Sequence, residues 1–135
     1  MKRKLRPVEV NRFQDQYILY QLLGERESFQ SISHKMMPTM SEHIAFVQGH
    51  PYEHWYMVVA DHVVVGATYL TPHNEIGIGI FKAHQGKGHA KWALEELMRT
   101  HAGPFYANIN PNNHASIALF SSLGFNLLQE TYSHE

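Results

Sequence analysis

One stretch, residues 75–100, sets most of what this chain can fold into. It begins with isoleucine at every second position (Ile76, Ile78 and Ile80), which is the period of a β-strand with one buried face. The loop HQGKGH at residues 84–89 follows, and apolar side chains then recur at helical spacing. A glycine-containing loop that opens a helix offers unpaired N–H groups and the positive end of the helix dipole. The sequence therefore predicts a site for a phosphate-bearing ligand at this loop.

The other face of the predicted strand carries two glycines. Glu75, Gly77, Gly79 and Phe81 alternate with the isoleucines and so point to the opposite side of the sheet. Glycine weakens a strand, and two on one face indicate close approach by a ligand or another backbone. We therefore expect this strand to line a binding site.

Length, charge and residue types limit the function classes. The 135 residues predict a single domain spanning residues 1–135. A net charge of −1 gives no reason to expect nucleic acid or membrane as a partner, and no apolar run reaches the roughly 18 residues of a spanning helix. The absence of cysteine fits a cytoplasmic protein without disulfides. Of eleven histidines, only His50 and His54 have i, i+4 spacing, and Pro51 separates them, so no metal site is expected.

The remaining pattern predicts the element order β-α-α-β-β-β-α-β-α-β. Thr39 and Glu42 match a capping box at the start of the second helix, and Asn11 is the predicted N-cap of the first. The expected elements outside residues 75–100 are strands at 4–8, 54–60, 63–71, 105–109 and 126–132, and helices at 11–23, 39–48 and 114–122. This order predicts an α+β fold with about four helices and a mostly antiparallel sheet, in which the strands at residues 75 and 105 are parallel neighbours.

Two motifs carry a resemblance to a known family. Residues 85–90 (QGKGHA) match the Q/R-x-x-G-x-G/A signature of the GNAT N-acetyltransferase superfamily, at the place between strand and helix where that family has it. Residues 113–120 (NHASIALF) followed by LGF at 123–125 resemble the family's second motif. The loop matches neither G-x-G-x-x-G nor G-x-x-x-x-G-K-[ST]. The chain thus resembles a GNAT enzyme along nearly its whole length.

The resemblance implies acetyl-CoA as the acetyl donor. The N–H groups of residues 86–91 would hold the pyrophosphate, and residues 78–80 would hydrogen-bond the pantetheine arm as an added strand. Asn113 would contact the donor or cap the following helix, and both roles stay open. The implied donor-binding residues are Ile78, Gly79, Ile80, Gln85, Gly86, Lys87, Gly88, His89, Ala90, Lys91, Asn113 and Phe120.

Acetylation of an amine needs a base for the amine and a proton for the departing thiolate. Glu75 is the predicted base, acting directly or through water, and His34 and His73 are the alternative bases. The other interpretation of Glu75 is a solvated carboxylate without a catalytic role. The position at which the family usually has a tyrosine acid is Phe120, which cannot donate a proton. The proton would then come from water or from another hydroxyl, for which the sequence offers Tyr106, Tyr69 and Ser116.

The acceptor is predicted from weaker patterns. Residues 33–39, the Trp55-Tyr56 pair and N-P-x-N-x-x-S at 110–116 look similar to GNAT enzymes that act on nucleotide-linked amino sugars of surface polysaccharide synthesis. The implied acceptor-binding residues are His34, Lys35, Trp55, Tyr56 and Tyr69. A small-molecule primary amine is the expected acceptor; a protein or peptide amine, or a CoA-binding sensor module without turnover, are the alternatives. The chain is expected to be a monomer or a homodimer.

Overall fold

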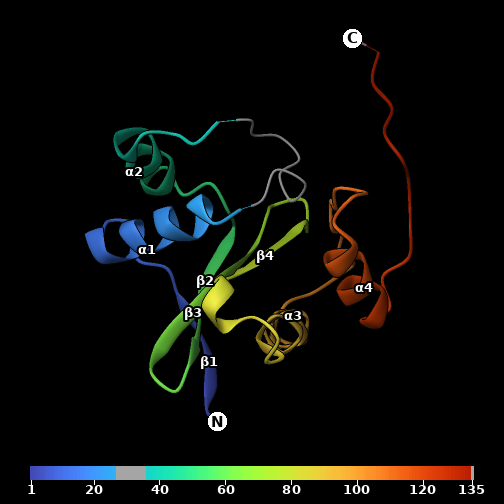
Figure 1. The fold of residues 1–135 in the computed structure, drawn as a ribbon, viewed down its shortest axis with the longest axis horizontal. Coiled ribbons are helices and arrows are strands. Elements are labelled where there is room, and N and C mark those ends of the chain that lie inside the picture. Colours follow the sequence, from blue (N-terminus) through green and yellow to red (C-terminus); the bar gives the residue numbers. More distant parts are fainter. Residues whose placement is uncertain (27–35, 135) are drawn as a thin grey trace.

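The computed structural model describes residues 1–26 and 36–134. Four strands form one antiparallel sheet in the order β1-β2-β3-β4 (Figure 1). The strands are β1 (Arg3–Pro7), β2 (His54–Ala60), β3 (Val63–Leu70) and β4 (Ile76–Ile80). The helices are α1 (Phe13–Gly24), α2 (Met40–Gln48), the short 3-10 helix η1 (Lys82–His84), α3 (His89–Thr100) and α4 (His114–Ser122).

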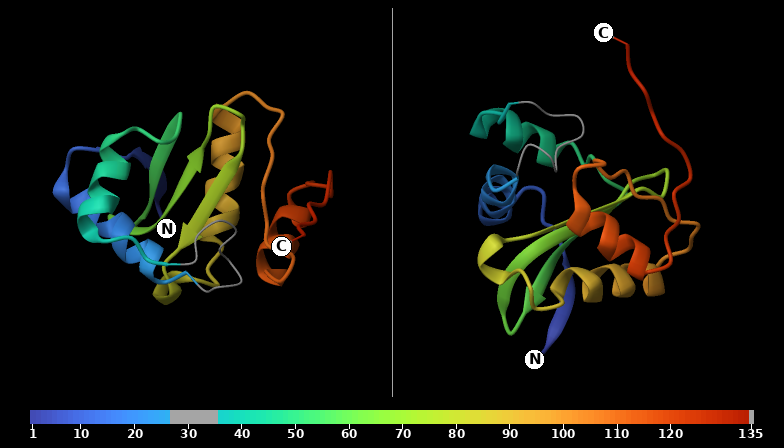
Figure 2. Two further views of the ribbon diagram at one scale, coloured as in Figure 1. Left: turned by 90° about the horizontal axis from the view of Figure 1, so that it is seen from above. Right: turned by 45° about the vertical axis from the view of Figure 1, so that its right-hand side comes forward.

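The sheet separates two helical layers. Helices α1 and α2 lie over one face, whereas α3 and α4 lie on the other side (Figures 1 and 2). Alternation along β2 supplies both cores: Met57 and Val59 pack with Leu19 and Val47, whereas the intervening Val58 packs with the α3 side. None of the helices in the described residues is long and apolar enough to span a membrane.

The predicted α+β architecture is confirmed, with four α-helices and an antiparallel sheet in the part of the chain that the structure describes. The capping box is present: Oγ1 of Thr39 accepts from the Glu42 N–H (3.1 Å), and Oε1 of Glu42 accepts from the Thr39 N–H (2.9 Å). The predicted N-cap of α1 is wrong. Arg12 is the N-cap, without a side-chain hydrogen bond, and the helix begins one residue later than an Asn11 cap requires.

The C-terminal third differs from the prediction. The expected strand at 105–109 is reduced to one parallel bridge between Glu75 and Tyr106, made by the Ile76 N–H to Tyr106 O (2.8 Å) and the Tyr106 N–H to Asn74 O (2.9 Å). After this bridge the segment forms no further pair with β4. The predicted parallel strand pair is therefore reduced to the single bridge between Glu75 and Tyr106.

The final predicted strand, residues 126–132, is not a strand either. The chain beyond α4 runs away from the body of the molecule (Figure 2), and Leu127 and Leu128 are 80% and 75% exposed. A strand is stable only when its N–H and C=O groups find a neighbour. Because residues 105–109 do not continue the sheet, this chain offers the tail no edge at that place.

Candidate active site

The glycine loop leads directly into α3. Gly86 (φ 79°) and Gly88 (φ 83°) both have left-handed backbone, which favours glycine, and Gly88 is the N-cap of α3. Gly88 has no side chain to cap the first-turn N–H groups. A Cβ at Gly86 would meet no atom within 4 Å, so the loop is open there. An open loop with uncapped N–H groups at a helix N-terminus suits a phosphate group.

Two predicted donor-binding side chains are used inside the protein. Nε2 of Gln85 donates to the Ile80 carbonyl (2.9 Å). The ring of His89 is 3% exposed, and its Nδ1 accepts from Nε of Arg3 in β1 (3.0 Å). The His89 side chain is therefore buried and held by Arg3, and it does not face a ligand at the loop. Lys87 and Lys91 are exposed, and Ala90 is half-buried.

The outer edge of β4 is open beyond the bridge. The Ile76 N–H points outward to Tyr106, so alternation turns the N–H and C=O of Ile78 and Ile80 outward as well. The Ile80 carbonyl already accepts a hydrogen bond from the Gln85 side chain. Within the described part of the chain, the outward groups of Ile78 and the Ile80 N–H have no partner and can pair with an extended ligand. Gly79 pairs with Ala67 and directs its own backbone groups toward β3.

Glu75 lies at the other end of this edge. Its N–H donates to Oγ1 of Thr71 (3.0 Å), and that hydroxyl donates to Oε1 of Glu75 (3.4 Å). Nδ2 of Asn108 donates to Oε2. The half-buried carboxylate is thus oriented from both sides. Thr71 and Asn108 were not predicted; the one available signal is that Asn108 and Tyr106 share a face of the expected strand at 105–109.

Aromatic rings gather on the glycine face of the sheet. Tyr69 lies against Gly77, and Tyr52 stacks on Tyr69 with ring centroids 3.7 Å apart and planes 7° from parallel. Trp55 meets Tyr52 edge-on at 4.8 Å. Burial, followed by the interactions with Tyr69, raises the pKa of the Tyr52 hydroxyl, which therefore stays protonated. The structure brings the predicted Trp55 and Tyr69 together and adds Tyr52, which alternation from β2 could not place because it precedes the strand.

Tyr56 does not join this aromatic cluster. It follows Trp55 in β2 and so faces α3, where its hydroxyl hydrogen-bonds Nε2 of His101 (2.9 Å). The His54 ring lies 4.2 Å from that of His101, and both line a cavity of about 390 Å³ on that side. Burial, followed by His54, lowers the pKa of His101. Tyr56 thus lies on the opposite face from the other described acceptor-binding candidates; His34 and Lys35 lie outside the described residues. The alternative base His73 is exposed in the turn before Glu75.

The second motif forms α4 and its N-cap. Oδ1 of Asn113 accepts from the Ser116 N–H (3.1 Å), so the capping role is present. Phe120 is 4% exposed and packs edge-on against Phe125, with ring centroids 5.0 Å apart. Its ring belongs to the core between α3 and α4. The ring of a tyrosine at this position would be buried in the same core.

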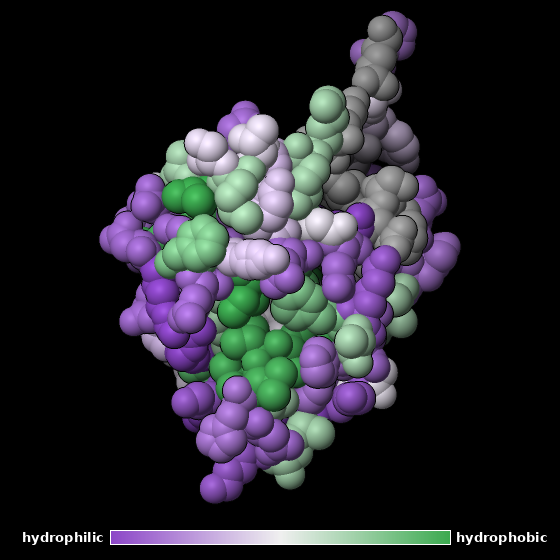
Figure 3. All heavy atoms as spheres, turned by 60° about the vertical axis from the view of Figure 1, so that its left-hand side comes forward, coloured by the Kyte–Doolittle hydropathy of each residue, from purple (hydrophilic) through white to green (hydrophobic). Residues whose placement is uncertain are grey.

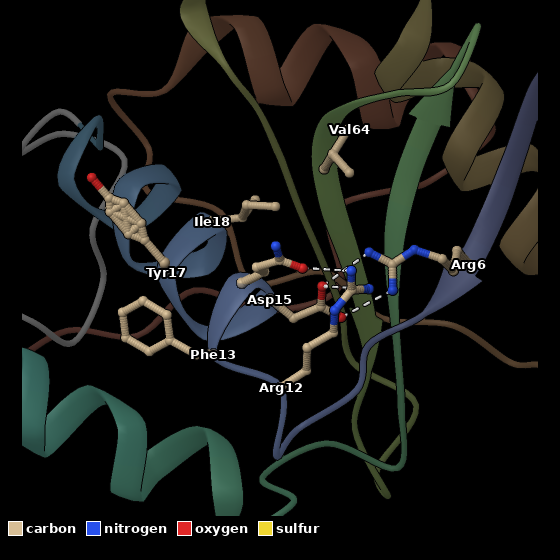
Figure 4. A pocket seen from close by; sticks show the side chains of 8 residues that line it. Arg6, Arg12, Phe13, Asp15, Tyr17, Ile18 and Val64 are labelled. Atoms are coloured by element: carbon tan, nitrogen blue, oxygen red, sulfur yellow. Dashed lines mark hydrogen bonds and ion pairs between the residues drawn. The ribbon is translucent and has the colours of Figure 1, made fainter.

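A second cavity of about 390 Å³ lies beside α1, lined by Arg6, Arg12, Phe13, Gln14, Asp15, Tyr17, Ile18 and Val64 (Figure 4). Asp15 accepts hydrogen bonds from both Nη atoms of Arg6 (2.9 and 3.0 Å) and from the Glu9 N–H (2.9 Å). Figure 3 shows apolar side chains gathered in a hollow on the side where α1 covers the sheet. The charged groups here pair with one another, Arg6 with Asp15 and Arg12 with Asp15 and Glu9, so we assign them a structural role.

Metal ligands do not gather in the described ranges 1–26 and 36–134: no three histidine, aspartate or glutamate side chains there could hold one ion.

Comparison with known proteins gives one family and several similar folds. Residues 17–125 match the acetyltransferase (GNAT) family model. The search of curated proteins gives no match. The fold is similar to that of yncA from Salmonella typhimurium, solved with its cofactor acetyl-CoA (TM-score 0.72, 20% identity, covering 93% of this chain and 80% of that chain).

Two further solved structures differ in the acceptors that they name. RimL, a ribosomal α-N-protein acetyltransferase in complex with coenzyme A, has a TM-score of 0.77 and 22% identity, covering 96% of this chain and 82% of its own. A chimera of the spermidine N-acetyltransferase SpeG from Vibrio cholerae has a TM-score of 0.74 and 18% identity, covering 90% and 79%. At these identities the likeness concerns the fold.

Proposed function

The chain belongs to the acetyltransferase (GNAT) family, and on that premise we propose that it transfers the acetyl group of acetyl-CoA to the primary amine of a small molecule. One observation carries the proposal: a single open strand edge connects the hydrogen-bonded carboxylate of Glu75 to the glycine loop at the N-terminus of α3. A donor that lies along this edge would have its phosphates at one end and its thioester near the other.

The donor would be held largely by backbone. Its pyrophosphate would accept hydrogen bonds from N–H groups of residues 86–91, where Gly86 and Gly88 keep side chains out of the way. The amides of its pantetheine arm would pair with the outward groups of Ile78 and Ile80 as a short added strand. Asn113 caps α4 and Phe120 packs in the core, so both would hold α4 in its place beside the donor.

Glu75 would take a proton from the incoming ammonium, directly or through a water. The neutral amine would then attack the thioester carbon, and the outward Ile78 N–H is suitably oriented to stabilise the oxyanion that forms. Breaking the C–S bond would leave a thiolate that needs a proton. Among the three candidate hydroxyls the arrangement favours Tyr69, because its ring reaches from β3 to Gly77, next to Ile78.

The acceptor would lie on the glycine face. Tyr69, Tyr52 and Trp55 form an aromatic wall in the same layer as Glu75, and such a wall suits a small molecule with an apolar or planar portion next to its amine. A nucleotide-linked amino sugar meets this description. The second candidate is a CoA-binding module without turnover, which the buried, hydroxyl-free Phe120 favours.

Thermal unfolding with acetyl-CoA tests the donor half. A ligand at 100 times its Kd stabilises the folded state by about 2.7 kcal/mol, so a rise of the melting temperature that saturates with acetyl-CoA is expected. No rise at millimolar acetyl-CoA would refute the proposal. Release of free thiol with a panel of small amines, amino sugars and peptides then tests turnover: binding with no thiol release from any acceptor would favour the module.

A further inference from the structure

We propose that Arg3 is a positioning residue for the acetyl donor: it holds the 86–89 loop in the shape that presents its N–H groups to the pyrophosphate. This inference rests on the proposed function, because it concerns the same loop. It adds a residue from the first strand, which neither motif contains.

Arg3 joins two parts of the chain that are far apart in sequence. It begins β1 at the edge of the sheet, paired with Ala60. Its guanidinium donates from Nε to Nδ1 of His89 (3.0 Å) and from Nη2 to the Lys87 carbonyl (2.9 Å). The planar, rigid fork of arginine fixes the two acceptors relative to each other, which a lysine ammonium cannot do. One side chain thus ties the loop and the first residue of α3 to the sheet.

The loop needs such a restraint because of its glycines. Gly86 and Gly88 flank Lys87, and glycine adopts many backbone conformations at similar cost. A loop that binds an anion through N–H groups must keep its carbonyl oxygens, which carry partial negative charge, turned elsewhere. The Lys87 carbonyl, between the two glycines, is directed at Arg3. We infer that this hydrogen bond selects the phosphate-binding form of the loop before the donor arrives, which lowers the ordering cost of binding.

The two hydrogen bonds from Arg3 to His89 and to the Lys87 carbonyl form what we call the clamp. His89 takes part in the clamp only in its neutral form, since Nδ1 must accept from Arg3. Burial is the main cause that lowers the pKa of His89, and the charges of Arg3, His84 and Lys87 act in the same direction; Asp61 opposes them. The ring is therefore neutral at neutral pH, with its proton on Nε2. As the pH falls below the ordinary histidine range, protonation removes the acceptor and releases this half of the clamp.

The experiment compares Arg3→Met, Arg3→Lys and Lys4→Met. Lys4 is the exposed neighbour on β1, so its replacement removes the same charge without touching the loop. We expect Arg3→Met to raise the Kd for CoA by about tenfold, as for the loss of a hydrogen bond to a charged group. Arg3→Lys should raise the Kd for CoA nearly as much, although lysine keeps the positive charge. Lys4→Met should change the Kd less than about twofold.

A truncated donor separates positioning from a general loss of structure. S-acetylpantetheine lacks the pyrophosphate, so Arg3→Met should raise KM for acetyl-CoA but leave KM for S-acetylpantetheine unchanged, with kcat at saturating acetyl-CoA retained. The Kd for CoA of Arg3→Met divided by the Kd of the unaltered chain should decrease as the pH falls, because protonated His89 no longer accepts from Arg3.

The outcomes distinguish a failure of the proposed function from a failure of the role of Arg3 alone. Failure of the unaltered chain to bind CoA would overturn the proposed function and the clamp together. CoA binding by the unaltered chain with an unchanged Kd in Arg3→Met, or equal losses with both donors, would overturn the clamp alone. An Arg3→Lys variant that binds CoA as the unaltered chain does would reduce Arg3 to a source of charge and also overturn the clamp.

Discussion

Tyr69 lies so close to Gly77 that a Cβ added at Gly77 would come within 2.0 Å of two carbons of the Tyr69 ring. The two residues are partners in the β3–β4 register, and Tyr52 stacks on Tyr69. Gly77 thus has a packing reason to be glycine: it lets an aromatic ring lie against the strand that would bind the donor. Gly79, two residues on, has ordinary contacts, with Leu22 at 3.5 Å from the position of an added Cβ.

The first prediction compares alanine at these two glycines. Gly77→Ala should lower the free energy of unfolding by about 1–3 kcal/mol, because the methyl group displaces the Tyr69 ring. Gly79→Ala should change it by less than about 0.5 kcal/mol. Urea denaturation measures both. Equal effects of the two substitutions would contradict the close packing of Tyr69 on Gly77.

The second prediction concerns the proton for the thiolate. Tyr69→Phe keeps the ring that packs on Gly77 and removes only the hydroxyl. If Tyr69 is the acid, kcat should fall by about 10²-fold while KM for acetyl-CoA and the melting temperature change little. Tyr106→Phe, which removes the hydroxyl of an exposed residue whose backbone is bridged to Glu75, is the comparison. Loss of kcat in Tyr106→Phe but not in Tyr69→Phe would move the acid to Tyr106.

The third prediction tests Glu75 as the base. Glu75→Gln keeps the shape of the side chain, and its amide can still contact Thr71 and Asn108. We expect kcat to fall by about 10²-fold near neutral pH and to recover as the pH rises, because the acceptor amine then loses its proton unaided. The Kd for acetyl-CoA should be unchanged. Glu53→Gln, in the cavity on the other face, is the control, and undiminished turnover in Glu75→Gln would exclude Glu75 from this role.

Local patterns explain what could be predicted from the sequence. The isoleucine period of β4, the capping box of α2 and the glycine loop each depend on residues within a few positions of one another, and all three are present. Alternation along β2 could also have separated Tyr56 from Trp55, because two consecutive strand residues point to opposite faces of the sheet. The prediction placed both residues at the acceptor on their aromatic character alone.

Contacts between distant segments explain what was missed. Nothing near Arg3 in the sequence indicates His89, and nothing near Glu75 indicates Asn108, because only the folded sheet brings each pair together. The tail at 126–132 has a strand-like composition, but a strand also requires a partner edge, which composition does not specify. Residues 105–109 supply one bridge to β4 and then diverge.

The last prediction concerns the ion pair beside α1. Burial of Asp15 opposes its charge, but the hydrogen bonds from Arg6 and from the Glu9 N–H, with the charges of Arg6 and Arg12, outweigh burial and lower the pKa of the carboxyl. A carboxyl with a lowered pKa stabilises the fold above its unfolded value of about 3.9, and this contribution is lost as the pH falls below that value. Stability should therefore decline in acid in part through Asp15.

Asp15→Asn should lower the free energy of unfolding by about 3 kcal/mol near pH 7, because it leaves the Arg6 guanidinium without its carboxylate. The difference from the unaltered chain should shrink as the pH falls below the ordinary aspartate value of about 3.9 and through the lowered pKa of Asp15, because the carboxyl then becomes protonated itself. Glu9→Gln is the control: its carboxylate pairs with Arg12, both side chains are well exposed, and the expected cost is below about 0.5 kcal/mol. Urea denaturation across this pH range measures the free energy of unfolding of each variant. If the difference between Asp15→Asn and the unaltered chain stays constant with pH, the shape of Asp15 and not its charge is stabilising.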